Sequence, residues 1–208
     1  MLSMKYARYH LFCLGLVLAV LVWSGIHPND RVTWAMEVAP VVIGLAILLP
    51  TYRRFTLTPL LYGLITFHCI ILMVGGKYTY AEVPLFNWLR DTFDLTRNHY
   101  DRVGHFVQGF VPAILARELL LRTSPLRPGK WLFTIAVCGC LAFSAFYELI
   151  EWQAAVAMGS GADAFLATQG DPWDTQKDMA LALFGAIVAQ LLLSRVHARQ
   201  VEPTLRRL

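Results

Sequence analysis

The stretch that decides the fold of this chain runs Asn98-His-Tyr-Asp-Arg-Val-Gly-His-Phe-Val-Gln-Gly-Phe110. It is the start of an apolar segment long enough to span a membrane, yet it contains Asp101 and His105. These two residues are four positions apart, slightly more than one helical turn, so the carboxylate and the imidazole project from one face. Because ionisable groups are costly to bury at membrane depth, the pair indicates a functional site with polar partners elsewhere in the chain.

The composition around this stretch is that of a membrane protein. Of the 208 residues, 57% are hydrophobic and 15% are charged, whereas soluble domains carry about 25% charged residues. We predict an all-α polytopic integral membrane protein, with residues 1–208 forming one membrane domain. Its six transmembrane helices are expected at apolar segments of roughly 17–25 residues, namely 10–26, 34–50, 57–76, 99–121, 131–152 and 177–194.

The distribution of basic residues predicts the orientation in the membrane. Lysine and arginine gather at the N-terminus, in the second and fourth loops and in the C-terminal tail. Positive residues favour the cytoplasmic side, so both termini are expected to be cytoplasmic in a bacterial inner membrane. The isoelectric point near 9.0 then reflects this bias and contact with anionic lipid head groups. The expected partners are membrane lipids and not nucleic acid, because no basic stripe carries interleaved aromatic residues.

All four cysteines, Cys13, Cys69, Cys138 and Cys140, fall within apolar segments. This placement argues against a disulfide framework, and the spacing Cys138-Gly-Cys140 is not that of a zinc-binding pair. We expect the cysteines to be small, buried packing residues.

The predicted topology brings four further acids to the level of Asp101 and His105. The fourth span enters from outside, the fifth ends outside at Glu148-Leu-Ile-Glu-Trp152, and the sixth begins outside at Asp174-Thr-Gln-Lys-Asp178. Within each acidic pair, the spacing of three or four residues places both side chains on one helical face. The candidate catalytic residues near the outer face are therefore Asp101, His105, Glu148, Glu151, Asp174 and Asp178.

So many acids in one place require positive charge or shared protons. The candidates are Arg97, Arg102, Lys177, a protonated His105, protons held between carboxylates, or a bound cation. Carboxylates together with imidazole suit divalent Mg, Mn, Zn or Fe. The candidate metal ligands are Asp101, His105, Glu148 and Asp178, with His68 as a further imidazole. Glu37, near the outer end of the second span, either joins this cluster or faces water.

The remaining polar residues predict plainer roles. Glu118 and Arg122, at the cytoplasmic end of the fourth span, are expected to form an ordinary surface pair, and Asp171 before Pro172 is a turn or cap residue. The chain has no Gly-rich phosphate loop, nucleophile elbow or His-Glu-x-x-His helix, which excludes the well-marked hydrolase classes. A metal-assisted or acid–base reaction remains compatible with the residues present.

Five sequence blocks carry a resemblance to a known family. They are Trp23-Ser-Gly-Ile-His-Pro28, Gly75-Gly-Lys-Tyr-Thr-Tyr80, Arg97-Asn-His-Tyr-Asp-Arg-Val-Gly-His-Phe106, Tyr147-Glu-Leu-Ile-Glu-Trp152 and Trp173-Asp-Thr-Gln-Lys-Asp-Met179. Over nearly its whole length the chain resembles the YjdF family of bacterial inner-membrane proteins, whose function is uncharacterised. The resemblance implies a multi-pass inner-membrane protein.

The second half is also similar, more distantly, to VanZ-like membrane proteins, which are associated with glycopeptide resistance and the cell envelope. Asp101, His105, Phe106, Glu148, Asp178 and Gly185 match that pattern. Glu151 replaces a Gln and Ala182 replaces an Asn, so the site here is more negative than the VanZ-like pattern.

Three hypotheses for the function follow. The first is an enzyme, with a divalent metal as its implied cofactor, that acts on an envelope lipid or a lipid-linked substrate. The second is a proton-coupled transporter or lipid-handling protein whose carboxylates carry protons. The third is a non-catalytic scaffold in which the acids only hold helices together through interhelical hydrogen bonds.

Overall fold

The computed structural model describes residues 6–158 and 167–205, and these form seven α-helices and one short 3-10 helix, without strands. The long helices are α2 (Ala7–Gly25), α3 (Arg31–Thr51), α4 (Pro59–Tyr78), α6 (Tyr100–Thr123), α7 (Lys130–Met158) and α9 (Asp174–Leu205). Between α4 and α6 lie η1 (Tyr80–Glu82) and the short helix α5 (Pro84–Thr92). The prediction of an all-α polytopic membrane protein is confirmed.

The helix starts have local causes. Asp30 precedes α3, and its carboxylate accepts a hydrogen bond of 2.6 Å from the backbone N–H of Thr33, the usual N-cap contact. Pro59 and Pro84 occupy the first turns of α4 and α5, where the N–H that proline lacks would have no helical partner. Each predicted span corresponds to one long helix, and for α3 and α4 the residues at the N-terminus explain where the helix begins.

The long helices have their apolar residues mostly on the outside. In the described part of the chain, five of them (α2, α3, α4, α7 and α9) are long and apolar enough to cross a membrane. Large residues such as Leu11, Phe12 and Leu191 are 66–68% exposed, whereas many charged side chains are buried. This inverted distribution is expected where lipid covers the surface. The sixth predicted span, α6, is not among the five, because its polar residues lower its hydropathy, and its role as a span stays a prediction.

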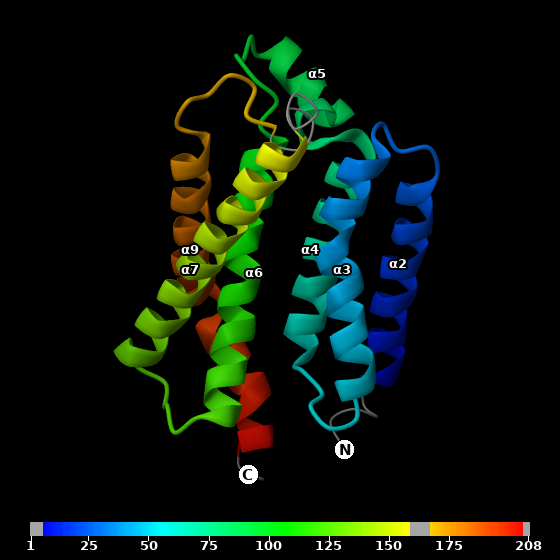
Figure 1. The fold of residues 1–208 in the computed structure, drawn as a ribbon. Coiled ribbons are helices and arrows are strands. Elements are labelled where there is room, and N and C mark those ends of the chain that lie inside the picture. The colour runs from blue at the N-terminus through cyan, green and yellow to red at the C-terminus, as the bar shows by residue number, and fades with distance from the viewer. Residues whose placement is uncertain (1–5, 159–166, 206–208) are drawn as a thin grey trace.

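The helices form two groups, α2–α3–α4 and α6–α7–α9 (Figure 1). In the first group α4 packs against both α2 and α3; in the second α6 packs most extensively against α9, and α6 also contacts α4. Gly109 on α6 and Gly185 on α9 allow this close approach, since a Cβ at either position would meet the backbone of Ala182 or Phe106 on the other helix. α6 therefore lies where the two groups meet, in contact with α7 and α9 of its own group and with α4 of the other.

Both termini lie at one end of the bundle, and α5 covers the opposite end (Figure 1). On α5, Leu85 and Trp88 are about 60% exposed, at 61% and 59%, which suits a helix that rests among lipid head groups. The acidic ends of α7 and α9 lie at this same end of the bundle. The fold therefore brings the predicted site residues to one level.

Two expectations about individual segments differ from the structure. α9 continues eleven residues past the predicted end of the last span at residue 194, to Leu205, so it presents His197 and Gln200 to the neighbouring helices. All four cysteines are free thiols, but Cys138 is exposed. Cys13 and Cys140 are buried as expected and Cys69 is half-buried. The expectation was wrong for Cys138, because this residue lies on the outward face of α7, where apolar residues also point toward lipid.

Candidate functional site

His105 is the centre of the buried polar cluster, and its two ring nitrogens face different partners. Nε2 lies 3.4 Å from a carboxylate oxygen of Asp101 and 3.8 Å from one of Asp178. Nδ1 lies 2.9 Å from the side-chain oxygen of Gln108 and 3.8 Å from Glu148. All these side chains are buried. The imidazole is therefore held between three carboxylates contributed by α6, α7 and α9.

Two arginines compensate the acids at the start of α9. Arg102 forms ion pairs with Asp178, with Asp174 at 2.5 Å and with Asp171 at 3.0 Å. Arg97 lies 2.7 Å from Asp174 and 3.6 Å from Asp101. A charged group buried with such partners is stable, whereas the same group alone would be very costly. Asp174 thus binds both guanidinium groups, and its position fits a structural role in the site.

The loops around the site are fixed by backbone contacts. Arg97 also donates to the carbonyl oxygens of Ala167 and Thr168, at 3.0 and 3.3 Å. Asn98 is fully buried, and it exchanges two hydrogen bonds of 2.9 Å between its backbone and the side chain of Gln169. These contacts join the segment before α6 to the segment before α9, so the arginines and acids are held in register.

Asp171 is confirmed as a turn residue, and it also takes part in the ion-pair network. Its carboxylate accepts a hydrogen bond from the backbone N–H of Trp173 and lies 2.7 Å from the Lys177 ammonium. These contacts, with that of Lys177 the largest, hold the pKa of Asp171 below its ordinary value. Of the basic residues considered from the sequence, Arg97 and Arg102 form ion pairs with the buried acids, whereas Lys177 pairs with Asp171.

A cavity of about 670 Å³ lies beside the cluster, between the two helix groups. Each surrounding helix contributes residues at helical spacing, so one face of each helix forms one wall. The walls comprise Glu37, Pro40, Val41, Gly44, Ile47, Leu48 and Thr51 of α3; Ile65, His68, Cys69 and Leu72 of α4; Asp101, Gly104, His105, Gln108, Val111, Pro112, Leu115, Leu119 and Thr123 of α6; and Phe143, Tyr147 and Glu151 of α7.

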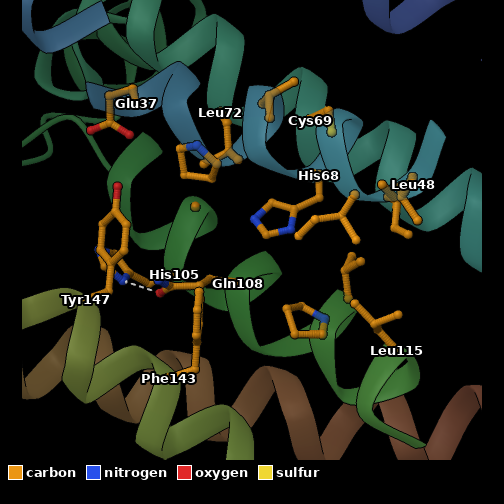
Figure 2. Close-up of a pocket in the computed structure, with 18 of the residues that line it drawn as sticks. Glu37, Leu48, His68, Cys69, Leu72, His105, Gln108, Leu115, Phe143 and Tyr147 are labelled. Carbon is orange, nitrogen blue, oxygen red and sulfur yellow. Dashed lines mark hydrogen bonds between the residues drawn. The ribbon is translucent and has the colours of Figure 1, made fainter. Parts of the chain in front are cut away.

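The two ends of the cavity differ in chemistry. Glu37 and the Tyr147 hydroxyl lie at one end, near His105 and Gln108, whereas Leu48 and Leu115 lie toward the other (Figure 2). Tyr80, Asp101 and Glu151 also line the cavity, and Glu37 is only 4% exposed. Of the two roles considered for Glu37, the structure shows the first, because its carboxylate is buried at the polar end and does not face water.

Apart from Asp174, which pairs with the two arginines, the predicted site residues divide into three sets. Asp101, His105 and Asp178 each offer a ligand atom, and these atoms all lie within 4.8 Å of one another. Glu148 lies on the other side of the imidazole, and Glu151 lines the cavity. His68 points into the cavity (Figure 2) but does not join the three-residue group. The first set has the donor types and the spacing to hold one divalent cation.

Two of the carboxylates around His105 have an oxygen that takes part in no hydrogen bond with the described residues. Asp101 Oδ2 and Glu148 Oε1 are buried without a hydrogen-bond partner. No lysine or arginine in the described part of the chain lies within salt-bridge distance of Glu148 or Glu151. Since a buried polar atom without a partner costs free energy, the cluster has capacity for a proton or a cation.

A second polar cluster lies near the terminal end of the bundle. Glu118 is 1% exposed; its carboxylate lies 2.8 Å from Arg122 and 3.0 Å from His197, and it accepts a 2.8 Å hydrogen bond from the Thr58 hydroxyl. The predicted pair of Glu118 and Arg122 is present. The prediction that it lies at the surface was wrong, because α4 and the extended α9 cover it. This cluster ties α4, α6 and α9 together.

Sequence reasoning missed several residues of both clusters. Gln108 lies three residues after His105, a spacing that could have indicated a contact with the imidazole. Tyr147 directly precedes Glu148, but nothing in its local sequence indicates the cavity. His197 was beyond the predicted end of its span, and its partner Glu118 is 79 residues away.

The comparisons with known proteins agree with this architecture. The family model described as a predicted membrane protein (DUF2238) matches residues 9–199. The chain belongs to the DUF2238 family. It is also similar to the inner membrane protein YjdF of Escherichia coli (strain K12), with 54% identity over 182 residues that cover 88% of this chain and 87% of YjdF. No solved structure matches.

The match to a membrane-protein family, the similarity to an inner membrane protein and the five long apolar helices together support a multi-pass protein of the inner membrane. The aligned region contains every candidate site residue from Glu37 to His197. The similarity to VanZ-like proteins is not shown by these matches and stays a prediction.

Proposed function

We propose that this protein binds an envelope lipid or a lipid-linked molecule in the cavity and catalyses a metal-assisted or acid–base reaction on its polar group. The observation that carries the proposal is the position of His105. Its imidazole, flanked by Asp101 and Asp178, lies at the polar end of a cavity whose remaining walls are largely apolar. Largely apolar pockets with a few convergent polar groups are typical of small-molecule sites.

The residues would divide the chemical work as follows. Asp101, His105 and Asp178 would hold a divalent cation, which would polarise a substrate oxygen or activate water. In the absence of a cation, the same imidazole would accept a proton from a water or a hydroxyl, with Asp101 stabilising the imidazolium. Gln108 holds the other ring nitrogen and so orients the ring. The carboxylates of Glu148 and Glu151 would accept protons that the reaction releases.

The same proposal includes an orientation. Both termini lie at one end of the bundle (Figure 1), and the basic loops favour the cytoplasm for that end, so the His105 cluster would open toward the periplasm. Single cysteines at Trp88 and Leu126, at opposite ends of the bundle, test this with a membrane-impermeant maleimide on whole cells. Labelling at position 126 but not at 88 would reverse the orientation.

Elemental analysis of detergent-purified protein tests the metal. Wild type should hold about one divalent cation per chain, and Asp178→Asn and His105→Ala should each lose it, while Asp91→Asn, an exposed acid on α5, should keep it. Glu148→Gln tests whether that carboxylate is also a ligand. Mass spectrometry of lipid extracts incubated with wild type or Asp101→Asn tests for a product. Wild type that binds no cation and yields the same lipids as the variant would overturn the proposal.

A transporter is the second candidate, and the length of the cavity favours it. The walls extend from Glu37 to Thr51 and Thr123, at the ends of α3 and α6 near the termini. However, these threonines are among the few polar residues of that half, which suits a hydrocarbon chain better than an ion. Lipid movement in proteoliposomes that depends on a pH gradient and on Glu37 would favour transport over catalysis.

A further inference from the structure

The charge of the cavity wall narrows the class of molecule that fits it. At the polar end the cavity is lined by the carboxylates of Glu37, Asp101 and Glu151. No lysine or arginine of the described residues lines it, because Arg97 and Arg102 point away toward the start of α9. The cavity therefore differs from sites for phosphate or carboxylate groups, which use arginine or lysine.

Aromatic rings accompany these acids. Tyr80 and Tyr147 line the same end, and the ring of Tyr80 sits where side chains at Gly75 and Gly104 would otherwise be. Tyr80 is 6% exposed, so its ring is held firmly between α4 and α6. Ammonium groups bind over the faces of aromatic rings, and this attraction is stronger where water is excluded. Carboxylates and tyrosine rings in one buried place form the chemistry that recognises an ammonium group.

The apolar part of the cavity suits a hydrocarbon chain. Glu37 and Thr51 are fourteen residues apart on α3, which corresponds to about 21 Å along the helix, or roughly two thirds of the hydrocarbon core of a bilayer. The residues between them that line the cavity are Pro40, Val41, Gly44, Ile47 and Leu48. The volume of about 670 Å³ falls within the roughly 300–1,000 Å³ of small-molecule sites.

Some residues of the cavity wall also belong to the outer surface of the bundle. Ile47 on α3 and Phe143 on α7 both line it and are 57% and 49% exposed, so the wall reaches the outer surface of the bundle between these helices. A molecule with a hydrocarbon chain would enter from the membrane itself, without passing through water.

We infer that the cavity binds a long-chain amphiphile with a positively charged ammonium head, the head lying among Glu37, Glu151, Tyr80 and Tyr147 and the chain lying along α3 and α6. The inference names the substrate class of the proposed function and so rests on it in part. Binding itself requires only the cavity and is measured without any reaction.

The experiment compares three probes with the same chain, hexadecylamine, hexadecanol and hexadecyl phosphate, titrated into purified protein in a non-ionic maltoside detergent. Thermal unfolding reports binding, since a ligand of the folded state raises the midpoint. Hexadecylamine should bind at least about tenfold more tightly than hexadecanol, equivalent to about 1.4 kcal/mol, and hexadecyl phosphate most weakly. In Glu37→Gln and Glu151→Gln the preference for the amine should fall severalfold while the affinity for the alcohol stays.

A pair of glycine variants shows where the probe binds. Gly44 lines the cavity and has no atom within 4 Å of where its Cβ would lie, so the Cβ of Gly44→Phe has open space around it and the larger side chain should occupy part of the cavity. Gly139 on α7 is equally open but does not line the cavity. Gly44→Phe should abolish binding of amine and alcohol, and Gly139→Phe should change neither.

Each outcome decides the inference. Equal affinity for amine and alcohol, a preference for the phosphate, or unchanged binding in Gly44→Phe would overturn it. Failure of the proposed function is distinguishable from these results: loss of the metal or product result with amine binding intact would leave the cavity inference standing. If the protein bound a metal but showed no preference for the amine, the proposed function would stand and the cavity inference would fall.

Discussion

Arg102 Nη2 on α6 lies 2.5 Å from Asp174 Oδ1 in the first turn of α9, and this ion pair fastens the two most closely packed helices at the level of the candidate site. The same guanidinium pairs with Asp178, which also faces His105. The structural network and the candidate site therefore share the carboxylate of Asp178, as they share that of Asp101 through Arg97, and the stability of the fold is coupled to the state of the site.

Removal of Arg102 should destabilise the protein strongly. Arg102→Ala leaves the buried carboxylate of Asp178 without its guanidinium partner and leaves Asp174 with Arg97 alone, which should lower the free energy of unfolding by about 3–5 kcal/mol. Arg102→Lys should recover only part, since an ammonium cannot bind several carboxylates as a guanidinium does. Denaturant unfolding in detergent measures both. Arg90→Ala is the control: Arg90 pairs with Asp91 on the surface and should change stability by less than about 1 kcal/mol. Equal effects of the two alanine variants would contradict the network.

Glu118 should be nearly as important at the other end of the bundle. Glu118→Ala removes the partner of Arg122, His197 and Thr58 and should cost about 3–5 kcal/mol, because buried charges and donors lose their acceptor. Thermal unfolding is the measurement. Asp91→Ala, which removes an exposed acid, should stay within about 0.5 kcal/mol. If Glu118→Ala were as mild as Asp91→Ala, Glu118 would lie at the surface after all.

The close approach of α6 and α9 should not tolerate even one methyl group. In Gly109→Ala the new Cβ would collide with the backbone of Ala182, so the helices must separate, at a cost of about 1–3 kcal/mol. Gly139→Ala has open space around its Cβ and should be neutral or stabilising by about 0.5–1 kcal/mol, since alanine favours a helix more than glycine does. Unfolding midpoints compare the two, and matching shifts would argue against the tight contact.

The acid side of the stability profile should depend on Asp171. Its folded-state pKa is depressed, mainly by Lys177, so the folded state binds the proton less readily than the unfolded chain does. The stabilisation is present above the unfolded pKa of about 3.9 and is lost as the pH falls through the lower folded pKa. In Asp171→Asn the free energy of unfolding should change less with pH between pH 3 and 5 than it does in wild type. An unaltered slope would show that Asp171 does not contribute.

Much of the architecture and part of the site follow from local sequence. Apolar segments of spanning length predict helices because a chain in lipid must satisfy its backbone hydrogen bonds internally, and all six predicted segments are helical. The spacing of Asp101 and His105 was sufficient to place them together, since both belong to one helix turn. Contacts between helices were beyond this reasoning: the register of α6 against α9 depends on where glycines permit close approach, as at Gly109.

The amino-acid sequence alone indicated a helical membrane protein and predicted that Asp101, Glu148, Glu151, Asp174 and Asp178 lie at one end of it, because hydropathy and helical periodicity are local properties. Tertiary packing decided the rest. Because of this packing, the His105 ring faces Asp178 and Asp174 pairs with two arginines. Glu118 is buried against His197, and an acid-lined cavity lies between the two helix groups. These contacts depend on which helical faces pack together, and the interactions that stabilise this packing join side chains that are far apart in the sequence.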